Sequence, residues 1–204
     1  MEKKQEIQKI TDEDTELIEA INSGKKDLFN DLVKKYEKKI YQFGLRMCRE
    51  PRDAEEMVQD TFLNTYRFLK YFRQETKFKN WLFKIASSAC LRKKRNNPVP
   101  WQNQISLEDF FKREGTNPTD QLPTWVSEPL ENILNQESSE VIRKSISLIP
   151  EKYRLVLVLR DLEGFSTEET ARILKLKPVT VKVRLHRARL YLKEKLKDYF
   201  EHEH

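Results

Sequence analysis

Hydrophobic positions recur at helical spacing along two stretches of the chain, from about Thr15 to Lys94 and from Leu130 to Tyr199. Apolar residues three or four positions apart share one face of a helix and can pack against a core. Between these stretches the periodicity fails, and residues 96–129 hold a cluster of prolines with aromatic and acidic residues. The pattern predicts an all-α protein in which two small helical domains, 15–95 and 130–200, are joined by an extended linker over 96–129.

The most informative local pattern lies in the basic tail, from Ser166 to Lys197. Ser166 and Glu169 have the spacing of a capping box at a helix start, and Pro178 suits the first position of the helix that follows. The inward face of this second helix is predicted to hold Val181, Leu185, Ala188 and Leu192. A short helix, a tight turn and a longer basic helix form the unit that places its second helix in the major groove of DNA.

The outward face and the flanks of this second helix supply the candidate contacts to duplex DNA. Arg187 can bond base edges or phosphate, and Val183 can touch a thymine methyl group. Arg189 lies on a flank, where its charge suits a phosphate. The candidate set is Thr180, Lys182, Val183, Arg184, His186 and Arg187. A solvated, lysine-rich surface helix is the alternative, but it would need neither the capping box nor the proline entry.

Composition agrees with a nucleic-acid partner. The net charge of +6 and the sequence pI near 9.1 favour a polyanion. No long apolar run and no apolar leader is present, so we expect no membrane insertion. The two cysteines, Cys48 and Cys90, indicate a reducing cytoplasm and packing roles rather than redox sensing. Without a glycine-rich phosphate loop or an H-E-x-x-H motif we expect no enzyme, cofactor or metal site, although abundant acids leave a carboxylate metal cluster open.

A helix is predicted from Asp53 to about Lys70, after Pro51 ends the preceding one, with Asp53 and Glu56 as its helix-start pair. Its inward face is predicted to hold Ala54, Val58, Phe62, Thr65 and Leu69. Its outward face carries Glu56, Gln59, Asp60, Leu63 and Arg67. A leucine among acids and amides indicates a protein contact, although single exposed leucines are also ordinary.

A polar loop framed by aromatic residues follows, from Tyr71 to Trp81. The next helix is predicted to bury Phe78, Leu82, Ile85 and Ala89, and to project Lys84, Ser87, Leu91 and Lys94 outward. Aromatic residues beside a basic helix can stack unpaired bases while the charges follow the backbone. Most of these aromatic residues are expected in the core, and some in the capture of a single strand. The acidic stretch from Asp12 to Glu19 fits either a helix start or a regulatory extension.

These segments resemble the sigma-70 family of transcription initiation factors, in its extracytoplasmic-function subgroup. The second conserved region of that family is similar to DAEEMVQDTFLNTY and FKNWLFKIASSACLRKKR. The fourth region is similar to LIPEKYRLVLVLRDLEGFSTEETARIL and VTVKVRLHRARLYLKEKL. No segment long enough for the third domain lies between them. The resemblance covers roughly Leu28 to Arg95 and Leu130 to Leu196.

The resemblance implies partners and sites. The chain would bind core RNA polymerase at two places, the clamp helices of the large subunit and the flap. The residues that would contact the clamp helices are Glu56, Gln59, Asp60 and Leu63. The promoter minus-ten element would be recognised and opened by Tyr71, Phe72, Arg73, Gln74, Lys77, Asn80, Lys84, Ser87 and Lys94. The candidate duplex contacts of the tail would read the minus-thirty-five element. The linker would thread toward the polymerase active-site cleft, and an anti-sigma factor is a common partner in this subgroup.

Several positions depart from the family pattern. Lys175 stands where a glycine is usual in the turn, Lys177 where a cap serine is frequent, and Val179 where another glycine is common. A residue other than glycine in a left-handed turn costs about 1 kcal/mol, which leaves the shape of this turn open. Tyr66 replaces a frequent tryptophan. The competing functions are a stand-alone helix-turn-helix regulator and an enzyme that acts on nucleic acid.

Overall fold

The computed structural model describes residues 9–48, 50–96 and 136–202, and every regular element in these ranges is a helix, as the all-α prediction requires. The chain divides into two compact units, Met1–Lys93 and Lys94–His204, and each has its own buried core. Residues 97–129 of the predicted linker lie outside the described ranges.

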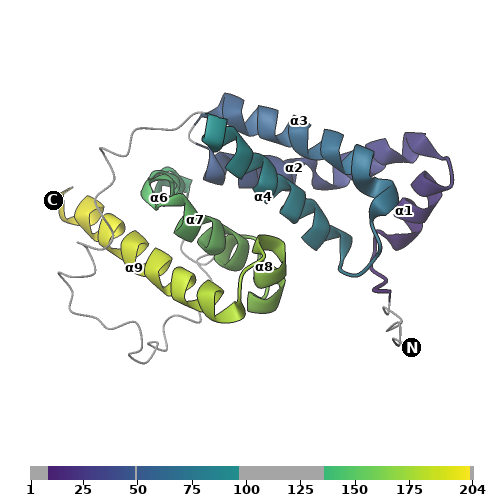
Figure 1. The fold of residues 1–204 in the computed structure, drawn as a ribbon. Coiled ribbons are helices and arrows are strands. Elements are labelled where there is room, and N and C mark those ends of the chain that lie inside the picture. The colour runs from purple at the N-terminus through teal and green to yellow at the C-terminus, as the bar shows by residue number, and fades with distance from the viewer. Residues whose placement is uncertain (1–8, 49, 97–135, 203–204) are drawn as a thin grey trace, which may run out of the picture. The chain divides into compact units, whose positions relative to one another are not determined.

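The helices appear in Figure 1. The first unit is built from α1 (Thr15–Asn22), η1 (Lys26–Leu28), α2 (Phe29–Met47), α3 (Pro51–Phe68), η2 (Leu69–Tyr71) and α4 (Phe78–Asn96). The second is built from α6 (Gln136–Leu148), α7 (Glu151–Leu157), the π-helical turn η6 (Val158–Leu162), α8 (Thr167–Leu174) and α9 (Pro178–His202).

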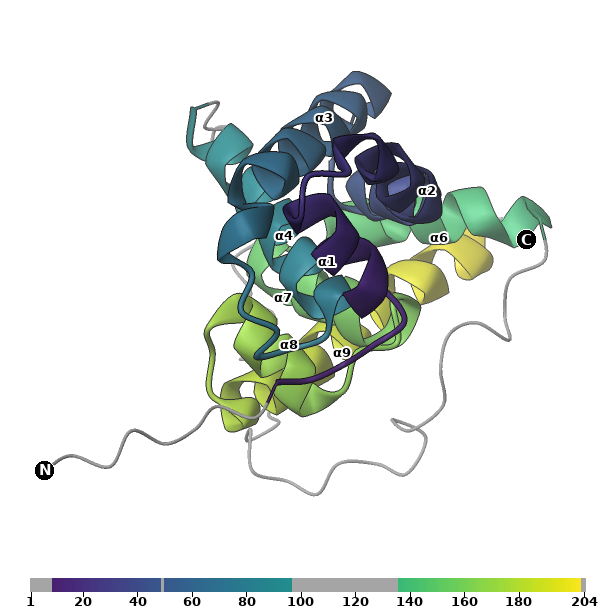
Figure 2. The same cartoon turned by 90° about the vertical axis from the view of Figure 1, so that its right-hand side faces the viewer.

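The core of the first unit lies among α2, α3 and α4. Buried side chains repeat along α2 at steps of three and four residues, at Leu32, Tyr36, Ile40, Phe43 and Met47. Phe43 meets Phe83 of α4 edge to face, with ring centroids 5.4 Å apart. Gly44 brings α2 close to α3, because a Cβ at this position would lie 3.3 Å from the Ala54 Cα. These two helices accordingly run side by side in both views (Figures 1 and 2).

The prediction for α3 was wrong in two respects. The helix begins at Pro51 rather than Asp53, and the side chain of the N-cap residue, Glu50, makes no capping hydrogen bond. Its buried stripe runs through Ala54, Met57, Thr61 and Thr65, while Val58 and Phe62 are only partly buried. Two threonines can face the core because their hydroxyls donate to main-chain oxygens four residues earlier, at 2.7 and 2.8 Å. These hydrogen bonds satisfy the buried hydroxyls, so Thr65 faces the core as predicted and Thr61, to which the prediction gave no face, does so as well.

The second unit confirms the local predictions for the tail. The Ser166 hydroxyl accepts from the Glu169 N–H at 3.1 Å, and the Glu169 carboxylate accepts from the Ser166 N–H at 2.8 Å. Pro178 is the first residue of α9. The predicted inward face is buried at all four positions, Val181, Leu185, Ala188 and Leu192.

The turn between α8 and α9 keeps a left-handed residue without a glycine. Lys175 has φ 54° and ψ 45°, in the left-handed region. Its neighbour Leu176 donates its N–H to the Ala171 carbonyl at 2.9 Å, which closes the end of α8. The turn is therefore the ordinary helix-ending turn, held by hydrogen bonds against the steric cost of a lysine Cβ.

Arg189 does not project toward solvent as its flank position indicated. Its guanidinium donates to both carboxylate oxygens of Asp161, at 2.7 and 2.6 Å, and the two side chains are 12% and 4% exposed. The π-helical turn η6 carries Asp161, so the pair ties α9 to the turn after α7. Arg189 is a structural residue of the second unit, and the prediction of a phosphate contact is corrected.

Candidate nucleic-acid and protein interfaces

The outward face of α3 carries the four residues predicted to bind polymerase. Glu56, Gln59, Asp60 and Leu63 are all exposed, and 55% of the Leu63 surface faces solvent. Their spacing of three, one and three residues places them on one helical face. Further along the same helix two more large apolar side chains are exposed, Tyr66 at 47% and Phe68 at 49%. Sequence patterning did not find Phe68, since it assigned no face to this position. The α3 surface is thus acidic and apolar together, and exposed apolar side chains rimmed by polar ones are a feature of interaction sites.

The loop between η2 and α4, residues 72–77, exposes part of the predicted minus-ten set. Tyr71 just before it is 64% exposed, and Arg73 and Lys77 are also exposed. Phe72 is half-buried, and its ring lies 5.8 Å from that of Phe78 and 5.1 Å from that of Trp81. Phe72 therefore packs in an aromatic cluster with Phe78 and Trp81 at the start of α4 and is a packing residue of the loop.

Three residues of the predicted minus-ten set are buried. Gln74, Asn80 and Ser87 are 7%, 6% and 2% exposed. Gln74 has φ 58°, and its amide donates to the Glu19 carboxylate at 3.3 Å. The expectation that these side chains face a DNA strand is corrected, because each polar group packs inside the first unit. The side chain of Lys94 lies outside the described residues.

Lys84 remains exposed and borders an open groove of about 240 Å³ on the first unit. The groove lies between α3 and α4 and is lined by Asn64, Phe68, Trp81, Lys84, Ile85 and Ser88. Its lining is mainly apolar and aromatic, and it includes the basic residue Lys84. Such a surface can hold a flat ring while it attracts a nearby phosphate.

The solvent side of α9 is polar and basic around an apolar strip. Val179 is 70% exposed and Lys182 is exposed, while Thr180, Val183, Arg184, His186 and Arg187 are partly exposed. Arg187 also donates to the Tyr153 hydroxyl at 3.4 Å, so it is braced against α7. Burial, and then the charges of Arg187 and Arg189, lower the pKa of His186 below its usual value, which favours the neutral ring. This face has the donors and apolar contacts that direct readout of a major groove needs.

Within the ranges that the structure describes, no three or more His, Cys, Asp or Glu side chains gather into a group that could hold a metal ion. In the same ranges no helix has the length and apolar character to span a bilayer.

Comparison with known proteins gives two family matches, Sigma-70 region 2 over residues 32–97 and Sigma-70, region 4 over residues 139–192. The ECF RNA polymerase sigma factor SigW of Bacillus subtilis is 30% identical over 181 residues, which cover 89% of this chain and 95% of that protein. The ECF RNA polymerase sigma-E factor of Haemophilus influenzae is 31% identical over 185 residues, 90% of this chain and 95% of that protein.

Among solved structures, CnrH in complex with the cytosolic domain of CnrY has a similar fold. The TM-score is 0.62 at 21% sequence identity, over 92% of this chain and 99% of that chain. At this identity the likeness concerns the fold alone.

Proposed function

Because the chain belongs to the extracytoplasmic-function (ECF) group of sigma-70 RNA polymerase sigma factors, we propose that its two units divide the work of promoter recognition. The chain is a transcription initiation factor that binds core RNA polymerase and directs it to specific promoters. Residues 15–95 dock on polymerase and open the minus-ten element, residues 130–200 read the minus-thirty-five element, and 96–129 connect them. RNA synthesis remains the chemistry of the polymerase, and the chain works in the cytoplasm, where the DNA is.

The exposed face of α3 is the docking surface for the clamp helices of the large polymerase subunit. Leu63 is the single observation that carries this assignment, because it is more than half exposed amid Glu56, Gln59 and Asp60. An apolar anchor surrounded by polar residues is the usual centre of a binding surface. A stand-alone helix-turn-helix regulator would leave this surface without a use. The second unit binds the polymerase flap.

The surface around the 72–77 loop captures the opened strand. Tyr71, Arg73, Lys77 and Lys84 are the exposed members of the predicted set and make the contacts. Unstacking costs a few kcal/mol for each flipped base, and stacking on an aromatic side chain returns about 1–3 kcal/mol. The buried members Gln74, Asn80 and Ser87 shape the surface instead of touching DNA.

The α9 helix reads the minus-thirty-five duplex. The capping box and the left-handed turn at Lys175 set the angle between α8 and α9, as in other helix-turn-helix units. Lys182 and Arg184 bind phosphates, and Val183, His186 and Arg187 reach base edges. We also propose an anti-sigma partner, because the sigma factor RpoE from Bartonella quintana, whose fold is similar, was solved in complex with the anti-sigma factor NepR.

A crossed pair of variants tests the division of labour. Leu63→Asp is expected to weaken binding of the full chain to core polymerase about thirtyfold, since a central anchor contributes roughly 2 kcal/mol. Lys38→Asp, which also places an acidic side chain at an exposed position of the first unit but on α2, away from the α3 face, is the control and should bind as wild type. Lys182→Ala should spare polymerase binding, weaken duplex binding uniformly and reduce its salt slope by about 1.

Polymerase binding is measured by pull-down with core polymerase from the source organism. Duplex binding is measured by fluorescence anisotropy of promoter fragments. The fragments are selected by transcription of a genomic library with the wild-type holoenzyme. Equal polymerase binding by Leu63→Asp and wild type would remove the docking assignment.

A further inference from the structure

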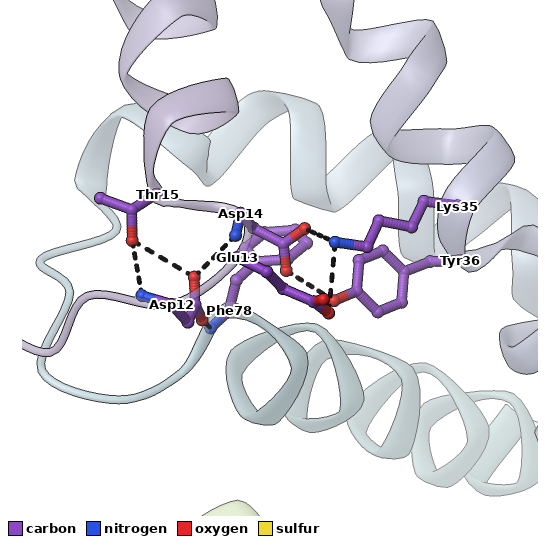
Figure 3. Close-up of polar contacts among 7 residues, drawn as sticks. All are labelled: Asp12, Glu13, Asp14, Thr15, Lys35, Tyr36 and Phe78. Carbon is purple, nitrogen blue, oxygen red and sulfur yellow. Dashed lines mark hydrogen bonds and ion pairs between the residues drawn. The ribbon is translucent and has the colours of Figure 1, made fainter.

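An acidic N-terminal segment, residues 10–15, lies against the start of α4 (Figure 3). One Asp12 carboxylate oxygen accepts from the main-chain N–H of Phe78 at 2.6 Å. The other accepts from the Asp14 N–H at 3.0 Å, and the Asp12 N–H donates to the Thr15 hydroxyl at 2.8 Å. Asp12 therefore connects the N-terminal segment to a helix that starts 66 residues later.

The bond to Phe78 replaces a local helix cap. Phe78 is the first residue of α4, and the first N–H groups of a helix have no partner within it. The preceding residue is Lys77, whose side chain has no acceptor to offer. A carboxylate at this end also interacts favourably with the helix dipole. Asp12 supplies from a distance what the local sequence lacks.

A second tie holds the middle of the 72–77 loop. The Gln74 carbonyl accepts from the Ile10 N–H at 2.8 Å, and its side-chain amide donates to the Glu19 carboxylate at 3.3 Å. Gln74 is in the left-handed region, a conformation that its surroundings must impose. The two ties fix the loop at its middle and at its end.

The segment is itself anchored to α2. Asp14 is 1% exposed and accepts from Lys35 Nζ at 2.5 Å and from the Tyr36 hydroxyl at 2.6 Å. Burial, and then the hydrogen bond to Asp14, raises the pKa of Tyr36, so the phenol stays a donor. The Tyr36 ring in turn meets Phe78 edge to face, with centroids 5.6 Å apart. The anchor and the cap thus converge on the same first residue of α4.

We propose that Asp12 is a positioning residue for strand capture, and that residues 10–19 hold the 72–77 loop in its capturing shape before DNA arrives. This inference rests on the proposed function of the loop. The segment precedes the part of the chain that matches Sigma-70 region 2, which begins at residue 32. Asp12 touches no DNA in this proposal, and its effect passes through Phe78 and Gln74.

The test compares Asp12→Ala with Glu16→Ala in the full chain. Both variants remove one acidic side chain from residues 10–19, and Glu16 is exposed. Loss of a cap costs about 1 kcal/mol, so Asp12→Ala should reduce open complexes roughly fivefold, measured by permanganate reactivity of the selected promoter. Binding of a single-stranded minus-ten oligonucleotide to the holoenzyme should fall by a similar factor. Closed complexes and polymerase binding should equal those of Glu16→Ala.

Hydrogen exchange separates positioning from unfolding. Asp12→Ala should speed exchange of the peptide that spans residues 72–82 and leave α2 and α3 unchanged. If α2 and α3 also exchange faster in Asp12→Ala, the milder variant Asp12→Asn is used in its place. Its amide oxygen can still accept one of the two hydrogen bonds, so we expect about a twofold loss of open complexes. If both Asp12 variants form as many open complexes as Glu16→Ala does, the proposal is overturned. A wild-type chain that neither binds polymerase nor opens promoters would instead refute the proposed function.

Discussion

The pair between Arg189 and Asp161 distinguishes a structural arginine from a DNA-binding one. Arg189→Met leaves the Asp161 carboxylate, 4% exposed, without the two charged donors that now lie at 2.6 and 2.7 Å. An uncompensated buried charge costs about 3–5 kcal/mol. Asp161→Ala should cost less, because the long arginine side chain can move its charge to solvent. The double variant Asp161→Leu with Arg189→Met removes both charges and should lie within about 2 kcal/mol of wild type.

Hydrogen exchange of the full chain measures the effect in each unit separately. Arg189→Met should lower the opening free energy of α7, η6 and α9 by about 3–5 kcal/mol. Their amides should then exchange more than about a hundred times faster than in wild type. Peptides of α2 and α3 serve as the internal control and should not change. If Arg189→Met exchanges like wild type and loses only duplex binding, the arginine acts on phosphate and the structural assignment fails.

Two further substitutions test the backbone. Lys175→Gly should relieve about 1–2 kcal/mol of left-handed strain, partly offset by unfolded-state entropy, and so raise the melting temperature by a few degrees in circular dichroism. Lys175→Ala keeps the Cβ and should give no such gain; an equal gain would contradict the strain argument. Gly44→Ala should destabilise by about 1–3 kcal/mol in urea titration, because its Cβ would lie 3.3 Å from the Ala54 Cα and force α3 outward. A stabilised Gly44→Ala would show that helix propensity outweighs this close approach.

The features that could be predicted from sequence are those fixed by local chemistry. The capping box at Ser166, the proline entry at Pro178 and the buried stripe of α9 depend on residues a few positions apart. Two of the errors, at Arg189 and Gln74, concern long-range satisfaction of polar groups. Asp161 pairs with a residue 28 positions away, and Gln74 with one 55 positions away. Polar residue types indicate exposure only when no distant partner is available, and periodicity does not identify that partner.

Pre-ordering of the 72–77 loop explains why so small a protein can contribute to strand opening. Fixing the backbone of a free residue costs about 1–2 kcal/mol, so ordering six loop residues on DNA would consume roughly 6–12 kcal/mol. In this structure the loop is already ordered when the protein folds. The hydrogen bonds of Asp12 and Gln74 hold it, and Phe72 packs on Phe78 and Trp81. Contacts made later by Tyr71, Arg73 and Lys77 can then offset the unstacking of bases rather than the ordering of the protein.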